Sequence, residues 1–269
     1  QELGEGPVAL LIHGTGAATH SWRALAPALA KRFRIVAPDL PGHGFTERPP
    51  AGRMTLPGMG ASLRGLLDAL GLEPELLIGH SAGAAIGVRM VIDGRAHPKL
   101  VVGLNGAFFP FRGVGARFLA PVARLFSRTS IAPLIVSARA RDPANVERLI
   151  QGTGSTLDAE GAELYRRLVR KPSHVAAALA MMASWDLSTM AHDLRRLDVP
   201  LLLLTGDRDQ AVDPRESERA ARRAPRARAV SMPGLGHLAH EEDPDATARH
   251  IEAAFRAATS PSGAVANPF

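Results

Sequence analysis

The chain has 269 residues and a net charge of +6, from 32 basic and 26 acidic side chains, and 46% of its residues are hydrophobic. This length and composition fit one large α/β domain with an insertion, and they exclude a disordered chain. The absence of cysteine excludes a disulfide scaffold, thiolate metal sites and cysteine nucleophiles, and no apolar run approaches the roughly 18 residues of a membrane span.

Short apolar runs alternate with helical stretches, a pattern typical of a mostly parallel sheet with helices on both faces. Six strands are predicted, at residues 8–12, 34–37, 76–79, 100–104, 199–205 and 228–232. Helices are predicted at residues 21–31, 56–70, 82–92, 214–223 and 245–257. The tail from residue 259 onward is rich in small residues and contains proline, so we expect it to be frayed.

The strand rhythm stops after Leu104 and resumes at Val199. Between them, residues 107–190 are predicted to form several short helices, broken by prolines and glycines that include Pro133, Pro143 and Pro172. An all-helical block between two core strands is typical of a lid over the strand ends. We therefore expect an α/β core of residues 1–106 and 191–269, with an inserted helical lid at residues 107–190.

The strongest local pattern is Gly79-His80-Ser81-Ala82-Gly83, which directly follows an apolar strand and directly precedes a helix. A G-x-S-x-G sequence at such a junction is typical of a nucleophile elbow, in which small flanking residues allow a very tight turn. The turn would lift the Ser81 hydroxyl clear of the backbone, at the positive end of the helix. The competing interpretation is a glycine-rich turn with an ordinary capping serine.

A nucleophilic serine needs a base that is itself oriented by a carboxylate, and here the expected chain order is serine, acid, histidine. Asp209 and His237 each follow a predicted strand, where a crevice forms beyond the strand ends. We favour Asp209 over Asp207, because the chain is still turning at Asp207. Asn105, at the alternative acid position, carries no charge, and His240 is interpreted as a surface histidine or a supporting residue rather than the base.

An oxyanion hole needs two backbone N–H groups beside the nucleophile. The loop His13-Gly14-Thr15-Gly16 follows the first predicted strand, and its glycines let the backbone come close. We predict that the N–H groups of Thr15 and Ala82 form the oxyanion hole. His13 and His80 are predicted to be packing residues.

The glycines of the same loop also imitate a dinucleotide-binding fingerprint, with Asp39 as its ribose-binding acid. Thr19 replaces the third glycine, however, and a dinucleotide site would leave Ser81, Asp209 and His237 unexplained. We therefore expect no cofactor. The His-x-x-His pattern that begins at His237 lacks an evident third ligand, so we also expect no metal.

At this point the chain clearly resembles the α/β-hydrolase family over almost its whole length. The matching segments are His13-Gly14-Thr15-Gly16, Asp39-Leu40-Pro41-Gly42-His43-Gly44, Gly79-His80-Ser81-Ala82-Gly83, Gly206-Asp207-Arg208-Asp209 and Gly236-His237. The resemblance implies an α/β-hydrolase fold and a catalytic triad of Ser81, His237 and Asp209, with oxyanion donors at Thr15 and Ala82. It also implies one or two strands before Val8, where only seven residues stand.

More narrowly, the chain looks like the magnesium-chelatase accessory proteins of bacteriochlorophyll biosynthesis. The segments that suggest this are residues 11–22, residues 37–46 and, within the variable lid, Ala180-Met181-Met182-Ala183-Ser184-Trp185-Asp186-Leu187. The resemblance implies a role at the magnesium-insertion step of photosynthetic pigment synthesis and a magnesium chelatase subunit as partner. It also implies a cytoplasmic protein that associates peripherally with the intracytoplasmic membrane. The resemblance does not settle which reaction the protein catalyses.

The predicted lid has an unusual composition. Residues 106–141 hold six arginines, five of the nine phenylalanines and no Asp or Glu. Apolar surface ringed by guanidinium groups suits a small hydrophobic substrate with carboxylates, such as a porphyrin, and equally an anionic membrane surface. The other interpretation is a packed lid with solvated arginines. Our candidate substrate contacts are Phe108, Phe109, Arg112, Met181 and Trp185.

A second basic cluster is formed by Arg215, Arg219, Arg222 and Arg223 at helical spacing. We interpret it as a solvated helix face, and we expect no nucleic-acid partner because no nucleic-acid-binding motif accompanies it. Two functional hypotheses follow for the chain as a whole. The first is a serine hydrolase acting on ester-like bonds, and the second is a non-catalytic tetrapyrrole-binding accessory protein or chaperone for magnesium chelatase.

Overall fold

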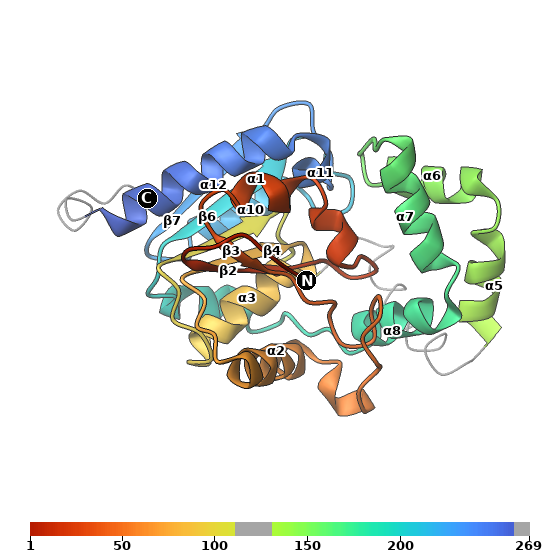
Figure 1. The fold of residues 1–269 in the computed structure, drawn as a ribbon, viewed down its shortest axis with the longest axis horizontal. Coiled ribbons are helices and arrows are strands. Elements are labelled where there is room, and N and C mark those ends of the chain that lie inside the picture. Colours follow the sequence, from red (N-terminus) through yellow and green to blue (C-terminus); the bar gives the residue numbers. More distant parts are fainter. Residues whose placement is uncertain (111–130, 261–269) are drawn as a thin grey trace.

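A mostly parallel sheet forms the centre of the structure, a computed structural model that describes residues 1–110 and 131–260 (Figure 1). Within these residues it has seven strands in the order β1-β3-β2-β4-β5-β6-β7. All neighbouring strands are parallel except β1 and β3. The strands are β1 (Glu2–Leu3), β2 (Val8–Ile12), β3 (Arg34–Val36), β4 (Leu76–His80), β5 (Leu100–Leu104), β6 (Leu201–Gly206) and β7 (Ala227–Met232). The predicted fold class is confirmed.

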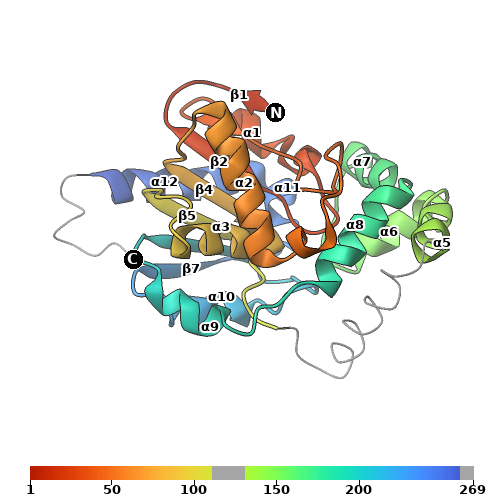
Figure 2. The same ribbon diagram turned by 90° about the horizontal axis from the view of Figure 1, so that it is seen from below.

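Helices cover both faces of this sheet, because successive side chains of a strand point to opposite faces. Leu10 and Ile12 pack against α2 (Leu56–Leu70) and α3 (Ala82–Ile92), whereas Ala9 and Leu11 pack on the other face with α1 (Leu25–Leu29) and α12 (Pro244–Thr259). The central strands β4, β5 and β6 are buried throughout, which explains their uninterrupted apolar sequences. Figure 1 shows α1 and α12 above the sheet and α2 and α3 below it, and Figure 2, seen from below, shows α2 and α3 in front of the sheet.

Two N-terminal features differ from the sequence-based expectations. The helix predicted at residues 21–31 is divided into a 3-10 turn, η1 (Thr19–Trp22), and α1, which begins at Leu25. Pro27 lacks a backbone N–H, and this division places it in the first turn of α1, where none is needed. The residues before Val8 form β1, a two-residue antiparallel edge strand.

Between β5 and β6, the described residues form helices joined by short connectors and contain no strand. The four longer helices are α5 (Ile131–Arg139), α6 (Pro143–Gln151), α7 (Ala159–Val169) and α8 (Pro172–Ala183). We call these four the inserted helices; Figure 1 shows them together at one side of the core. Pro143 and Pro172 are the first residues of α6 and α8, so they begin these helices rather than break them, and Pro133 lies within α5.

The remaining elements are short. They are η2 (Ala51–Arg53), α9 (Met190–Asp193), η3 (Leu194–Arg196), α10 (Arg215–Ala221) and α11 (Ala239–Glu242). The α2 helix ends as expected at Gly71, whose φ of 64° is the left-handed conformation of a glycine C-cap. None of the helices in the described part of the chain has the length and hydropathy to span a bilayer.

Candidate active site

Ser81 occupies a sharp turn between β4 and α3. Its φ of 52° and ψ of −117° lie in a strained region that costs on the order of 1–3 kcal/mol and is held by the surrounding structure. A Cβ atom at Gly79 would lie 2.4 Å from the backbone of Gly83, and one at Gly83 would lie 2.1 Å from the carbonyl oxygen of Ile12. Only glycine fits at these two positions, which explains the spacing of the motif.

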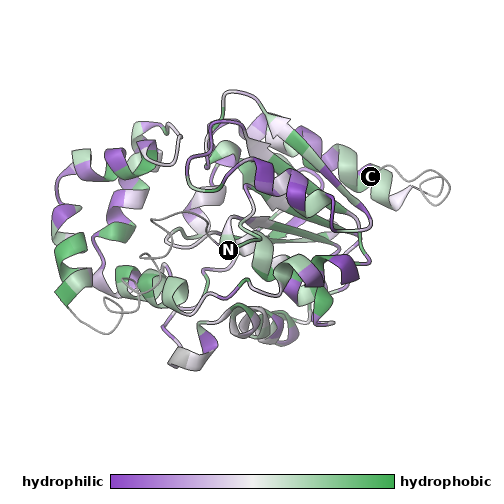
Figure 3. Ribbon diagram, turned by 180° about the vertical axis from the view of Figure 1, so that it is seen from behind, coloured by the Kyte–Doolittle hydropathy of each residue, from purple (hydrophilic) through white to green (hydrophobic). Residues whose placement is uncertain are grey.

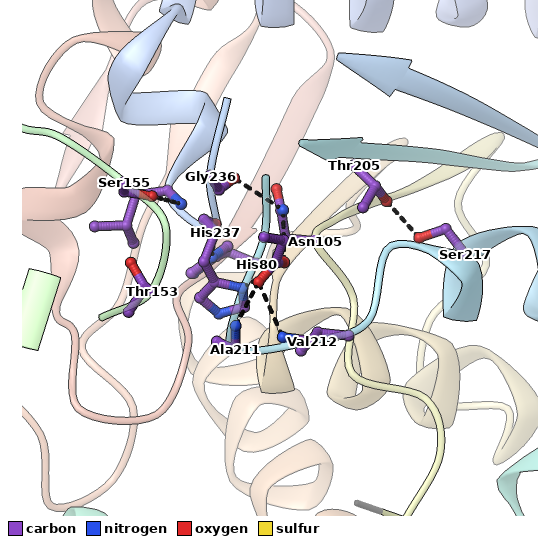
Figure 4. A network of polar contacts seen from close by, with 12 residues as sticks. His80, Asn105, Thr153, Ser155, Thr205, Ala211, Val212, Ser217, Gly236 and His237 are labelled. Carbon is purple, nitrogen blue, oxygen red and sulfur yellow. Dashed lines mark hydrogen bonds and ion pairs between the residues drawn. The ribbon is translucent and has the colours of Figure 1, made fainter. Parts of the chain in front are cut away.

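The Asp209 carboxylate, in the loop after β6, accepts four hydrogen bonds; its partners Asn105, Ala211, Val212 and His237 are labelled in Figure 4. Its Oδ1 accepts from the backbone N–H groups of Ala211 at 2.8 Å and Val212 at 2.9 Å. Its Oδ2 lies 2.8 Å from Nδ1 of His237 and accepts from the Asn105 amide at 2.8 Å. The Asp209 side chain is fully buried, so these donors replace the water that an ionised carboxylate needs.

Asp207 and His240, the alternatives for the acid and the base, do not take part in the hydrogen bond between Asp209 and His237. Asp207 is exposed and accepts a hydrogen bond from the N–H of Gly234 at 2.7 Å. His240 is buried, with its ring 4.9 Å from that of Trp22 and 4.5 Å from that of His80. Burial lowers the pKa of His240 to about 3, so this ring is neutral and serves as packing.

The sequence analysis missed the part that Asn105 plays in this site. Asn105 ends β5 with a φ of 48°, is fully buried, and donates to both Asp209 Oδ2 and the carbonyl oxygen of Gly236 at 3.1 Å. It was set aside because it carries no charge, yet an amide donor is what a buried carboxylate needs. The signal that identifies it is its place at a strand end, directly beside the acid-bearing strand.

His80, the residue before Ser81, packs against His237. The ring of His80 lies 4.8 Å from that of His237, and its Nε2 lies 2.9 Å from the His237 carbonyl oxygen. Burial holds the pKa of His80 well below its usual value, so Nε2 carries the hydrogen and donates it. Between the described Ser81 and His237 side chains the structure shows no hydrogen bond; in unliganded enzymes this contact is often long.

The loop after β2 lies against the serine. A Cβ atom at Gly14 would lie 3.1 Å from the Cβ of Ser81, so the backbone of Gly14 packs against the Ser81 turn. Thr15 is the next residue in the chain. The hydroxyl of Thr15 lies 3.5 Å from the Met181 sulfur of α8. The other predicted donor, Ala82, begins α3 immediately after Ser81.

Asp39 links this loop to the loop after β3. Its carboxylate accepts from the N–H groups of Thr19 at 2.8 Å and Phe45 at 2.9 Å. Burial alone would raise the pKa of Asp39, but these two hydrogen bonds and nearby His13 bring it below its usual value. Burial lowers the pKa of His13 to about 4, and its Nε2 accepts the N–H of Leu40.

The candidate substrate contacts fall into different environments. Phe108 is fully buried, and Cβ atoms at Gly103 and Gly106 would touch its ring. Phe109 lies beneath the Arg219 guanidinium, 4.0 Å from the ring centre, and lines a cavity of about 440 Å³ that also borders Asp209. Met181 is buried in the core and Trp185 packs against it half-buried, whereas Arg112 lies outside the described residues.

The chain belongs to the α/β-hydrolase family, whose model matches residues 9–250. It is 38% identical to the magnesium-chelatase 30 kDa subunit of Rhodobacter capsulatus over 88% of this chain and 82% of that protein. It is 29% identical to a fluoroacetate dehalogenase of a Burkholderia species, over 91% of this chain and 86% of that protein. A solved esterase from Thermogutta terrifontis superposes with a TM-score of 0.77 at 27% identity, covering 97% of this chain and 93% of the esterase.

Proposed function

We propose that the protein is a serine hydrolase that cleaves an ester-like bond with a triad of Ser81, His237 and Asp209. The observation that carries this proposal is the buried hydrogen bond of 2.8 Å between His237 Nδ1 and Asp209 Oδ2, beside a serine on a strained elbow. The Asp209 carboxylate fixes the tautomer with hydrogen on Nδ1 and leaves Nε2 of His237 as the proton acceptor.

In the proposed reaction, Ser81 Oγ attacks the ester carbonyl carbon while His237 Nε2 takes the hydroxyl proton. The carbonyl electron pair moves onto oxygen, where the N–H groups of Thr15 and Ala82 stabilise the charge. As the carbonyl re-forms, the alkoxide leaves with the proton from His237. Water then attacks the acyl-enzyme, His237 takes its proton and returns it to Ser81 Oγ, and the free acid departs.

The first prediction concerns the nucleophile. We expect a fluorophosphonate probe to label the native protein covalently, and Ser81→Ala to abolish labelling, because Ser81 is the one serine within residues 1–110 and 131–260 that has a positive φ. Intact-protein mass spectrometry measures the adduct. Ser62→Ala is the control, because the Ser62 hydroxyl only donates to the carbonyl of Gly58 within α2. Labelling that survives in the Ser81→Ala protein would identify a different nucleophile.

We also propose that the hydrolase serves magnesium-porphyrin and bacteriochlorophyll biosynthesis. The identity of 38% with a magnesium-chelatase subunit over most of both chains supports this link, and it is higher than the 29% identity with the fluoroacetate dehalogenase or the 27% identity with the solved esterase. The substrate would be a small hydrophobic carboxylated molecule such as a porphyrin, with the inserted helices as a lid, and a chelatase subunit would be a partner. Phe109 and Trp185 offer the aromatic contacts, and Arg219 is stacked on Phe109.

The same similarity favours a second candidate function, a tetrapyrrole-binding accessory protein that does not use its triad. Complementation of a strain that lacks the gene separates the two. Restored bacteriochlorophyll synthesis by the Ser81→Ala protein supports the accessory role, whereas failure by this variant alone supports hydrolysis. Titration of the purified protein with protoporphyrin, followed by its absorption band, tests binding in either case.

Peripheral membrane contact is part of the proposal. The α5 helix exposes Ile131, Leu134 and Ile135 by 64%, 55% and 51%, which is unusual for large apolar side chains. Figure 3 shows much of this helix in the green of hydrophobic residues. Arg139 ends the same helix and Arg141 follows it, and no Asp or Glu occurs in residues 106–141. An apolar face beside arginines suits the surface of an anionic bilayer.

A further inference from the structure

The connector between α6 and α7 lies against the loops that carry the proposed acid and base. We define this connector as residues 153–156. The carbonyl oxygen of Thr153 accepts two hydrogen bonds, one from the N–H of Gln210 at 3.1 Å and one from the N–H of His237 at 3.2 Å. One atom of the inserted helical region therefore joins the residue after Asp209 to the proposed base itself. Figure 4 shows Thr153 and Ser155 beside His237.

Further contacts fasten the connector to the histidine loop. Ser155 is 2% exposed, and its Oγ accepts the N–H of Leu238 at 2.8 Å. The carboxylate of Glu242 accepts from the N–H of Thr156 at 2.9 Å and from the N–H of Gly236 at 2.8 Å. The backbone on both sides of His237 is thus held by groups that also hold the connector.

The apolar packing follows the same pattern. Leu238, the residue after His237, is buried in a small hydrophobic cluster with Ala140, Val146 and Ile150. All three of those residues belong to the inserted helical region, whereas Leu238 belongs to the core sequence. Displacing the inserted helices would therefore expose Leu238 and pull on the chain directly beside the imidazole.

The backbones meet closely because glycines stand at the contact. Gly154 has a φ of 81°, and a Cβ atom there would lie 1.9 Å from the carbonyl oxygen of Arg208. A Cβ atom at Gly236 would lie 2.3 Å from the carbonyl carbon of Gly154. These contacts leave no room for a side chain at Gly154 or Gly236, so the connector fits between the two loops in a single position.

We propose that the connector is a positioning element that holds Asp209 and His237 in register, so that docking of the inserted helices and assembly of the acid–base pair are one event. The inference rests on the proposed function for its catalytic meaning. None of residues 153–156 touches the reacting atoms in the reaction described above. Their part is to fix the two loops whose spacing sets the hydrogen bond between Asp209 Oδ2 and His237 Nδ1.

The test compares two alanine substitutions of glycines with positive φ. Gly154→Ala places a methyl group against Arg208, whereas Gly94→Ala, at a φ of 67° after α3, meets nothing within 4 Å. Both variants carry left-handed backbone strain, and only the first disturbs the connector. In full-length protein labelled with 15N-histidine, the low-field resonance of the His237 Nδ1 hydrogen, assigned by its loss in His237→Gln, reports the acid–base pair directly.

We expect the resonance in the native and Gly94→Ala proteins and its loss in Gly154→Ala. The rate of fluorophosphonate labelling of Ser81 should fall about 100-fold in Gly154→Ala, as for a misplaced catalytic group. Ser155→Ala, a milder change for the case in which Gly154→Ala does not fold, should broaden the resonance and slow labelling about tenfold. An unchanged resonance and labelling rate in these variants overturns the inference, as does a native protein without the resonance.

The two proposals fail in different ways. If the resonance responds to the connector but the native protein is never labelled at Ser81, the positioning element stands and the serine hydrolase proposal falls. If labelling is normal in native protein and in every connector variant, the hydrolase stands and the positioning element falls.

Discussion

At the scale of single residues, the site depends on how each buried polar group is satisfied. Asp209 receives four hydrogen-bond donors, and the only side-chain amide among them belongs to Asn105. Because Asn105 donates at 2.8 Å rather than accepts, it adds no negative charge beside the carboxylate. The amide thus supplies a donor to the buried carboxylate without adding a competing anion.

Asn105→Asp tests this interpretation. The new carboxyl group would face Asp209 in a buried site, where two like charges raise the pKa of one of them. The native state would then bind more protons than the unfolded state above about pH 4, the ordinary range of an aspartate. We therefore expect the free energy of unfolding of Asn105→Asp, relative to native protein, to fall as pH rises from 4 to 8.

Urea denaturation at several pH values between 5 and 8 measures this difference. Asn105→Ala is the control, because it also removes the amide donor but introduces no titrating group. We expect the Asn105→Ala protein to be less stable than the native protein by an amount that changes little with pH. A pH-independent loss in both variants would show that the missing donor, and not the added charge, dominates.

At the scale of secondary-structure elements, the sequence predicts most of the sheet because buried parallel strands are continuous apolar runs. The predicted strand at 8–12 agrees with β2 to the residue, and Ser81 lies at the predicted strand–helix junction. Local sequence patterns did not predict the element boundaries that depend on a single backbone group or on pairing with a distant strand. Pro27 divides a helix that apolar spacing had joined, and the two-residue β1 depends only on its pairing with β3.

The candidate site shows the same limit. Ser81, Asp209 and His237 stand in motifs with a fixed chain order, so sequence alone selects them. The hydrogen bonds of Asn105 and Ser155 join residues 104 and 83 positions apart in the chain. No local signal reports such contacts, because they exist only once the loops and the inserted helices have packed.

At the scale of the whole molecule, buried histidines link stability to pH. Burial lowers the pKa of His240 to about 3 and that of His20 to about 4, and it holds those of His43 and His80 well below their usual value. The unfolded chain takes up protons near pH 6.5, whereas these native residues do not. We therefore expect the free energy of unfolding to fall as pH is lowered from 7 to 5.

Substitution of one buried histidine tests this expectation. His240→Gln should reduce the slope of unfolding free energy against pH by up to about 1.4 kcal/mol per pH unit below pH 6.5, the effect of one proton. His97→Gln, at an exposed histidine, should leave the slope unchanged. Denaturant unfolding at pH 5, 6 and 7 measures this slope. Equal slopes in the native and His240→Gln proteins would contradict the conclusion that His240 is neutral in the native state.

The exposed apolar residues of α5 belong to this scale as well, because α5 lies at the side of the molecule away from the sheet (Figure 2). We expect the protein to co-sediment with vesicles that contain phosphatidylglycerol, and Leu134→Glu combined with Ile135→Glu to reduce the bound fraction at least tenfold. Leu70→Glu on α2, where the side chain is 44% exposed, is the matched control. Equal binding of both variants would place any membrane contact elsewhere.

Leu238 is buried among residues of the inserted helices, and this contact limits how these helices can be exchanged between related proteins. A chimaera that receives these helices from a relative would also need a compatible residue directly after the proposed base, because the side chain at that position packs into the apolar cluster of the transplanted helices. Exchanging the helices alone would leave either a hole or a collision next to the imidazole. Substrate range and reaction machinery would therefore diversify together in this architecture, and not as separable modules.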